Sequence, residues 1–165
     1  MRKPKGVGLH DTLYYKSQKQ LLKNYIDNSE MPVVTHWSEK TYYITSDRIT
    51  FYLIPKDKYC LKESWVQSCE NVFHCTAQYA RDLFNVDARQ IKPTGNKYAL
   101  DSMYPENNIV MEFIANQDKI YIFEKGLELF PKQKVFFSCG ENNPILVVSS
   151  LDTILGGVWP LKTFE

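Results

Sequence analysis

The sequence has almost no excess of charge, because 20 lysine and arginine residues are set against 19 aspartate and glutamate residues, for a net charge of +1. A chain so close to neutral carries no overall positive field that would draw it to nucleic acid. It also lacks any apolar run near the roughly 18 residues that a membrane span needs. The N-terminal MRKPKGVGLHD leads into no long apolar segment, so we expect no secretory signal, no membrane partner and a cytoplasmic location.

The residue patterns of common catalytic and metal sites are missing as well. Cys60, Cys69, His74 and Cys75 come nearest to a zinc-binding set, but their spacing differs from the paired Cys-x2-4-Cys of zinc sites. Without a secretory signal, we interpret these cysteines and Cys139 as reduced thiols. No nucleophile motif surrounds a cysteine, and the N-terminal GVG lacks the third glycine and the preceding strand of a phosphate loop. We therefore expect a protein that is not an enzyme and that uses no cofactor or metal.

What the sequence does contain is typical of a globular α+β domain. Hydrophobic residues make up 44% and charged residues 24%, and the 11 Tyr and 9 Phe suit half-buried sheet positions. A chain of 165 residues most often forms one domain. We expect a single domain over 1–165 with a flexible basic arm at 1–12 and an irregular insertion at 63–106. Two or three short helices should cover an antiparallel sheet.

One amphipathic helix is predicted near the N-terminus, over 16–28. Ser17 has the spacing of a capping residue, with Gln20 three residues later. Apolar residues then repeat at helical intervals: Leu21, Leu22, Tyr25 and Ile26. We expect this apolar stripe to pack against Phe51 and Leu53 of the sheet.

Three lysines of this helix, Lys16, Lys19 and Lys23, form the clearest candidate surface in the sequence. At about 100° per residue they share a face apart from the apolar stripe. Such a face is either an ordinary solvated surface or a contact for phosphate groups, because each lysine adds salt-dependent affinity for a phosphate chain. We call these three residues the lysine face and treat them as the candidate DNA- or partner-binding residues.

Strands are predicted on both sides of a less regular middle. Before the middle, alternation predicts a strand, a hairpin and a short strand over 31–37, 40–56 and 58–61. The middle is expected to hold a helix that begins at Thr76 and a loop over 90–108. After it, we expect two strands, a short helix and a third strand over 109–115, 119–123, 123–130 and 134–140.

The last segment, NNPILVVSSLDTILGGVWPLK, predicts a closing β-hairpin. Its strands are 145–148 and 153–159, joined by the turn that begins at Ser149. Gly156 and Gly157 inside an apolar run indicate a bulge or a close backbone approach.

The order of elements from Lys119 to Lys162 resembles the closing half of a bacterial DNA sliding-clamp domain. It runs strand, short helix, strand, turn and two strands, and it ends in a hydrophobic-Pro-hydrophobic-basic pattern at 158–162. The first block, SQKQLLKNYI followed by TYYITSDRITFYLI, is similar to the start of such a domain. The resemblance implies a clamp-like domain with an irregular middle insertion, of the kind found in small proteins of phages and mobile elements.

The resemblance and the missing catalytic motifs together indicate a protein that works by binding. One function is a phage-type protein that contacts DNA or replication proteins and assembles as a homo-oligomer. The alternative is a phage-encoded inhibitor, of the anti-CRISPR kind or similar, that binds directly to a host antiviral defence protein. Both imply host or phage proteins as partners, a place in the host cell cytoplasm, and no cofactor.

Overall fold

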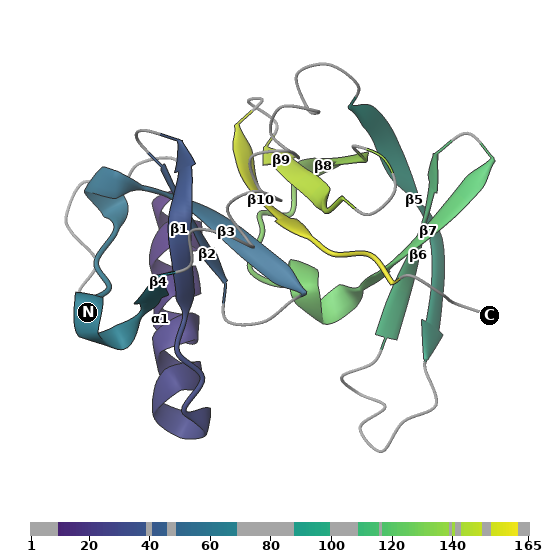
Figure 1. The fold of residues 1–165 in the computed structure, drawn as a ribbon. Helices are drawn as coiled ribbons and strands as arrows, with labels where there is room; N and C mark the ends of the chain where they lie inside the picture. The colour runs from purple at the N-terminus through teal and green to yellow at the C-terminus, as the bar shows by residue number, and fades with distance from the viewer. Residues whose placement is uncertain are drawn as a thin grey trace. The chain divides into compact units, whose positions relative to one another are not determined.

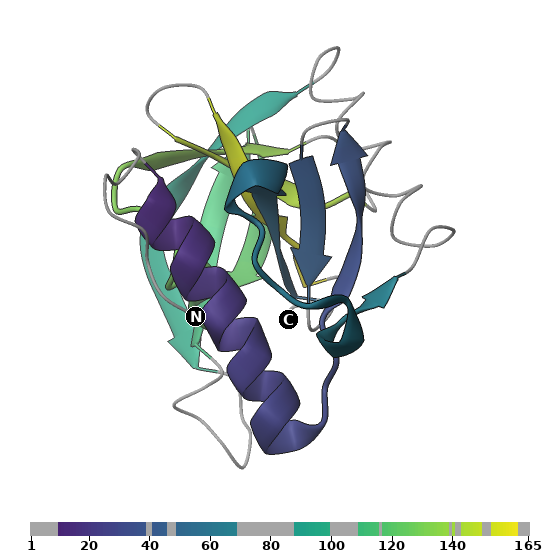
Figure 2. The same ribbon diagram turned by 90° about the vertical axis from the view of Figure 1, so that its left-hand side faces the viewer.

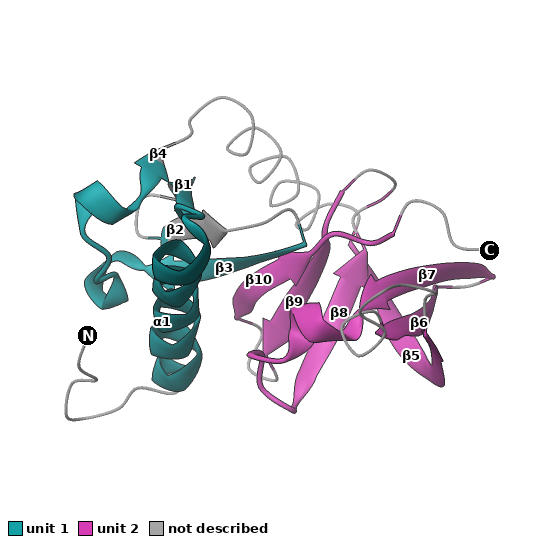
Figure 3. Cartoon of the chain, turned by 90° about the horizontal axis from the view of Figure 1, so that it is seen from below, with its two compact units in different colours: residues 1–79 teal, residues 80–165 magenta. Residues whose placement is uncertain are grey.

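The computed structural model describes residues 10–38, 41–45, 49–68, 88–99, 109–115, 117–138, 140, 143–149 and 153–161. The chain divides into two compact units, residues 1–79 and 80–165 (Figure 3). The expectation of a single domain over 1–165 stays a prediction. The predicted helix from Thr76 lies outside the described residues.

The first unit contains α1, Asp11–Asn28, whose full length is visible in Figure 2. It is the one α-helix among the described residues, where no helix is long and apolar enough to cross a membrane. The helix predicted over 16–28 is confirmed, but it begins earlier, at Asp11, whose negative charge suits the positive end of the helix dipole. Ser17 is not the cap that the sequence predicted. It is buried inside the helix and donates its hydroxyl to the carbonyl of Tyr14 at 3.1 Å.

The buried side of α1 differs from the predicted apolar stripe. Leu13 and Leu21 are only 4% and 3% exposed, whereas Leu22 is half-buried and Ile26 is 71% exposed. The earlier start explains the difference, because Leu13 adds a turn of apolar contacts and shifts the buried stripe away from Ile26. α1 packs through this side against β3, Thr50–Pro55, and the turn after it.

The sheet of the first unit has the strand order β4-β1-β2-β3 (Figure 1). Its strands are β1 Val33–Ser38, β2 Thr41–Thr45, β3, and the short β4 Gln67–Ser68. The neighbours β1–β2 and β2–β3 are antiparallel, which confirms the predicted hairpin, and β4 runs parallel to β1. The strand predicted over 58–61 is wrong. Lys56–Lys58 forms a 3-10 turn, η1, and an irregular segment leads from it to a second turn, η2, Glu63–Trp65.

The second unit is an antiparallel sheet with the order β10-β9-β8-β5-β6-β7. Its strands are β5 Arg89–Ala99, β6 Ile109–Ala115, β7 Asp118–Phe123, β8 Lys134–Ser138, β9 Ile145–Ser149 and β10 Ile154–Val158. β5 pairs with two strands: its first residues pair with β8, and its later residues pair with β6. All five residues of β9 are buried, which its apolar, β-branched run favours.

Two sequence predictions for this unit need correction. The loop predicted over 90–108 is a strand over residues 89–99, because a bulge between Pro93 and Lys97 accommodates the proline. Gly95 lies in that bulge at φ +91°, a backbone conformation that favours glycine. The short helix predicted over 123–130 is reduced to a 3-10 turn, η4, Glu124–Leu127.

The closing hairpin is confirmed. β9 and β10 are antiparallel, and their register shifts between Ile154 and Gly156, which is the bulge that the paired glycines predicted. The observed fold is therefore α+β and mostly β, and the described residues contain fewer helices than the sequence predicted.

Candidate functional site

The lysine face is exposed along one side of α1. Lys16, Lys19 and Lys23 are all exposed, and at the helical repeat they lie roughly opposite the buried Leu21. Ile26, which the sequence analysis placed on a separate apolar stripe, in fact continues the same row, because the spacing of the four residues alternates between three and four positions. The structure therefore brings the three predicted residues together and adds an exposed apolar residue at the end of their row.

Gln18 fixes which side of α1 faces outward. Its side chain is fully buried, at 0% exposed, and its amide group bridges the helix to the segment after η1. The Nε2 group donates to the carbonyl of Tyr14 at 3.0 Å and to the carbonyl of Lys58 at 2.9 Å. The Oε1 atom accepts from the backbone N–H of Cys60 at 2.8 Å and from its thiol at 3.4 Å. A rotation of α1 about its axis would break these bonds, so Gln18 holds the lysine face outward.

An ion pair ties the first turn of α1 to the same segment. The ammonium of Lys58 lies 3.3 Å from a carboxylate oxygen of the buried Asp11. The hydrogen bond to Asp11 raises the pKa of Lys58 above its ordinary value, so the lysine stays charged. This pair neutralises Lys58, while the basic residues of α1 itself are the three of the lysine face.

The second unit holds a buried carboxylate that the sequence analysis did not single out. Glu112 of β6 is 2% exposed, and both of its oxygens accept hydrogen bonds. Oε1 accepts from Thr94 at 3.0 Å and from Asn96 at 3.2 Å, both of which belong to the β5 bulge. Oε2 accepts from the hydroxyls of Tyr98 at 3.1 Å and Tyr121 at 3.3 Å.

The environment of Glu112 favours its charged form. Burial by itself would raise the pKa, but the hydrogen bonds that the carboxylate accepts outweigh burial and lower its pKa below the ordinary value of 4.5. Lys119, with its ammonium 4.0 Å away, acts in the same direction. Because donors from β5 and β7 occupy both oxygens, Glu112 ties three strands together as a structural anion. The alternation of side chains along β6 could have indicated this carboxylate, because Glu112 lies on the same face of the strand as the apolar Val110 and Ile114.

Of the candidate zinc ligands, Cys60 is the one that lies within the described residues. The Cys60 thiol donates to Gln18, and burial raises its pKa, which favours the protonated form that this bond requires. Cys69, His74, Cys75 and Cys139 lie outside the described residues. Within the part of the chain that the structure describes, no cluster of His, Cys, Asp or Glu side chains could hold a metal ion.

Comparison with known proteins assigns this chain to no family. No protein-family model matches the chain, and neither a curated protein nor a solved structure matches it. The resemblance to a sliding-clamp domain therefore stays a prediction.

Proposed function

We propose that this chain is a non-enzymatic binding protein, of the phage type and with a clamp-like fold, that contacts DNA through the lysine face. The observation that carries the proposal is the exposure of Lys16, Lys19 and Lys23 along one side of a helix. Their outward direction is fixed by the buried bonds of Gln18 on the other side. The order of strands and turns from β7 to β10 supports the clamp-like part of the proposal.

The lysine face suits phosphate contacts because its charge is local. The whole chain is almost neutral, so long-range attraction to DNA is weak. Three exposed ammonium groups in one row can each displace a counterion from a phosphate backbone, which gives affinity without sequence preference. Binding of this kind needs neither a cofactor nor a catalytic group.

A salt titration of DNA binding tests the proposal. Three released counterions predict that the logarithm of the association constant falls with the logarithm of salt at a slope of about 2.7. The triple variant Lys16→Gln, Lys19→Gln, Lys23→Gln should lose most of the affinity and nearly all of this slope. The matched control replaces the exposed Lys62, Lys92 and Lys132 by Gln, which changes the net charge equally on other elements. Equal DNA affinity for the parent and the lysine-face variant would refute DNA contact through α1.

A second function is favoured by Ile26, which extends the row of lysines and is 71% exposed. An apolar side chain gains little from a phosphate backbone, but it contributes to a protein interface with an acidic partner. Under this alternative the chain is a phage-encoded inhibitor that binds a host antiviral defence protein through α1. A homo-oligomer in which α1 contacts another copy belongs to the first function.

Ile26→Asp separates the two functions. If the partner is DNA, the substitution adds one negative charge near the lysine face and lowers affinity only modestly. If the partner is a protein, capture of that protein from host lysate should be lost with Ile26→Asp, while DNA binds neither the parent nor the variant. Light scattering after size-exclusion chromatography measures self-association, and a strict monomer at all concentrations would contradict the homo-oligomer.

A further inference from the structure

The second unit contains a pocket that the lysine face does not involve. Its volume is about 510 Å³, within the range of roughly 300–1,000 Å³ that is typical of small-molecule sites. The lining residues come from β5, β6, η4, β8 and the segment between η4 and β8. All of them belong to one compact unit.

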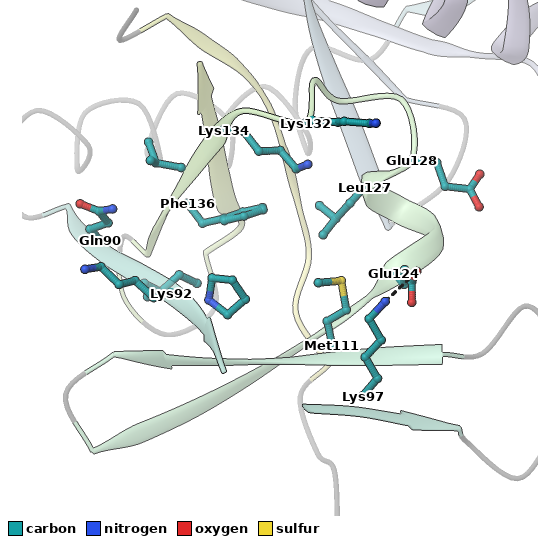
Figure 4. A pocket seen from close by; sticks show the side chains of 13 residues that line it. Gln90, Lys92, Lys97, Met111, Glu124, Leu127, Glu128, Lys132, Lys134 and Phe136 are labelled. Atoms are coloured by element: carbon teal, nitrogen blue, oxygen red, sulfur yellow. Dashed lines mark hydrogen bonds and ion pairs between the residues drawn. The ribbon is translucent and has the colours of Figure 1, made fainter. Parts of the chain in front are cut away.

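The inner part of the pocket is apolar. Leu127 of η4 and Phe136 of β8 are each about 6% exposed, and Met111 of β6 lies beside them. Figure 4 shows these three side chains directed toward one another from different elements. An apolar surface of this kind contributes affinity for the hydrocarbon part of a ligand.

One ammonium group lies at this apolar surface. Lys134 shares a face of β8 with Phe136, and its Nζ lies 5.9 Å from the centre of that ring. The Nζ donates to the carbonyl of Pro131 at 2.9 Å. An ammonium has three donors, so two remain for which the described residues supply no acceptor. Burial lowers the pKa of Lys134, as expected where a charged group lacks an anionic partner.

The other charges of the pocket limit what it can accept. Lys97 pairs with Glu124 at 3.2 Å, so its charge is already matched, and Figure 4 shows the ammonium of Lys132 directed away from the pocket centre. Glu124 Oε2 is buried, and no described residue gives it a hydrogen bond. A second negative charge near Glu124 would be repelled, which favours a ligand with a single anionic group.

We propose that this pocket binds a small monocarboxylate with an apolar body, whose carboxylate accepts hydrogen bonds from Lys134 and whose hydrocarbon part packs against Leu127, Met111 and Phe136. Lys92 and Lys132 also line the pocket, but both are exposed, so Lys134 is the ammonium at the apolar surface. A carboxylate fits the two remaining donors of this ammonium, whereas a phosphate dianion would require more positive charge than Lys134 alone supplies. The proposal is independent of DNA binding by α1.

Octanoate is the probe, and titration calorimetry with methyl-detected NMR of Met111 and Leu127 is the assay. Octanoate should bind the parent chain and shift both methyl signals. Octanol lacks the charge and acetate lacks the apolar body, so each should bind at least tenfold more weakly, as should octanedioate with its second carboxylate. Octanol that binds as tightly as octanoate would overturn the role of Lys134, and unchanged methyl signals would overturn the pocket.

Lys134→Met tests the ammonium directly, because methionine keeps an apolar chain of similar length. Loss of the charge-assisted hydrogen bonds from Lys134 should weaken octanoate binding by at least about tenfold to a hundredfold and leave octanol binding unchanged. Lys132→Met is the matched control, since it removes the same charge from the same segment, and it should bind octanoate like the parent. If Lys134→Met does not fold, Lys134→Arg keeps the charge and should retain octanoate binding. Equal octanoate affinity in the Lys134 and Lys132 methionine variants, or its loss in Lys134→Arg, would overturn the proposal.

Discussion

Gln18→Met is the substitution that most directly tests how α1 is held. Methionine has nearly the length and volume of glutamine, so the buried site stays filled. It has no amide group, so the bonds to the carbonyl of Lys58 and the N–H of Cys60 are lost. The variant therefore separates the hydrogen bonds of the bridge from its packing.

The expected destabilisation is about 2 kcal/mol. A hydrogen bond contributes about 1 kcal/mol net, and the two bonds to the segment after η1 are lost together. Both are part-buried, so water can reach the stranded backbone groups and reduce the larger penalty of a buried group without a partner. The carbonyl of Tyr14 keeps another donor in the hydroxyl of Ser17, so its loss of the Gln18 amide adds little.

Urea unfolding followed by circular dichroism measures this difference, with the free energy of unfolding extrapolated to water. Gln20→Met is the matched control, because Gln20 is exposed on the same helix and bonds only to Asn24 in this structure. The control should stay within about 0.5 kcal/mol of the parent. A Gln18→Met variant that unfolds like the control would refute the argument that this amide fixes the rotation of α1.

Substitutions at Leu21 and Glu112 test the interiors of the first and the second unit, respectively. Leu21→Ala should lower the free energy of unfolding by about 2–5 kcal/mol, because this side chain is buried. Ile26→Ala should change it by no more than about 0.5 kcal/mol, because Ile26 is exposed. Similar losses for both variants would contradict the observed orientation of α1. Glu112 has a pKa lowered from 4.5, so its contribution is fully present above pH 4.5 and is lost as pH falls through the lowered pKa. The melting temperature of the parent should therefore fall in that window, and Glu112→Gln should melt lower than the parent at pH 7 with a weaker dependence on acid; parallel curves would contradict the assignment.

The parts of the fold that the sequence predicted correctly are those with a strong local pattern. The strands of the closing hairpin follow from β-branched runs, and its bulge follows from the paired glycines. The sequence analysis missed β5 because Pro93 and Gly95 are typical of loops. They fit into a strand here because of a bulge, and that bulge forms only through the pairing of β5 with β6. That bulge carries Thr94 and Asn96 to Glu112, a contact that no local pattern contains.

The rotation of α1 about its axis likewise depends on a contact that no local sequence pattern contains. Helical periodicity identified the helix, but two apolar stripes were available, one through Leu13 and Leu21 and one through Leu22 and Ile26. Gln18 decides between them, because its amide finds partners in a segment about forty residues away only when the first stripe is buried. Helical periodicity contains no information about these long-range hydrogen bonds. The sequence analysis therefore placed Ile26 in the core, whereas the structure shows it exposed.

Salt should affect DNA binding at the lysine face and octanoate binding at Lys134 differently. The lysine face is exposed, and attraction between exposed charges is screened over roughly 8 Å at physiological ionic strength. Lys134 lies against Phe136 and loses solvent there, and partly buried charges are screened much less. DNA affinity should therefore fall steeply between 50 and 200 mM salt, about as the counterion slope of three lysines requires. Octanoate affinity should change little over the same range, because apolar burial and a short hydrogen bond contribute most of it. An octanoate affinity as sensitive to salt as DNA binding would mean that the carboxylate binds exposed lysines and not the pocket.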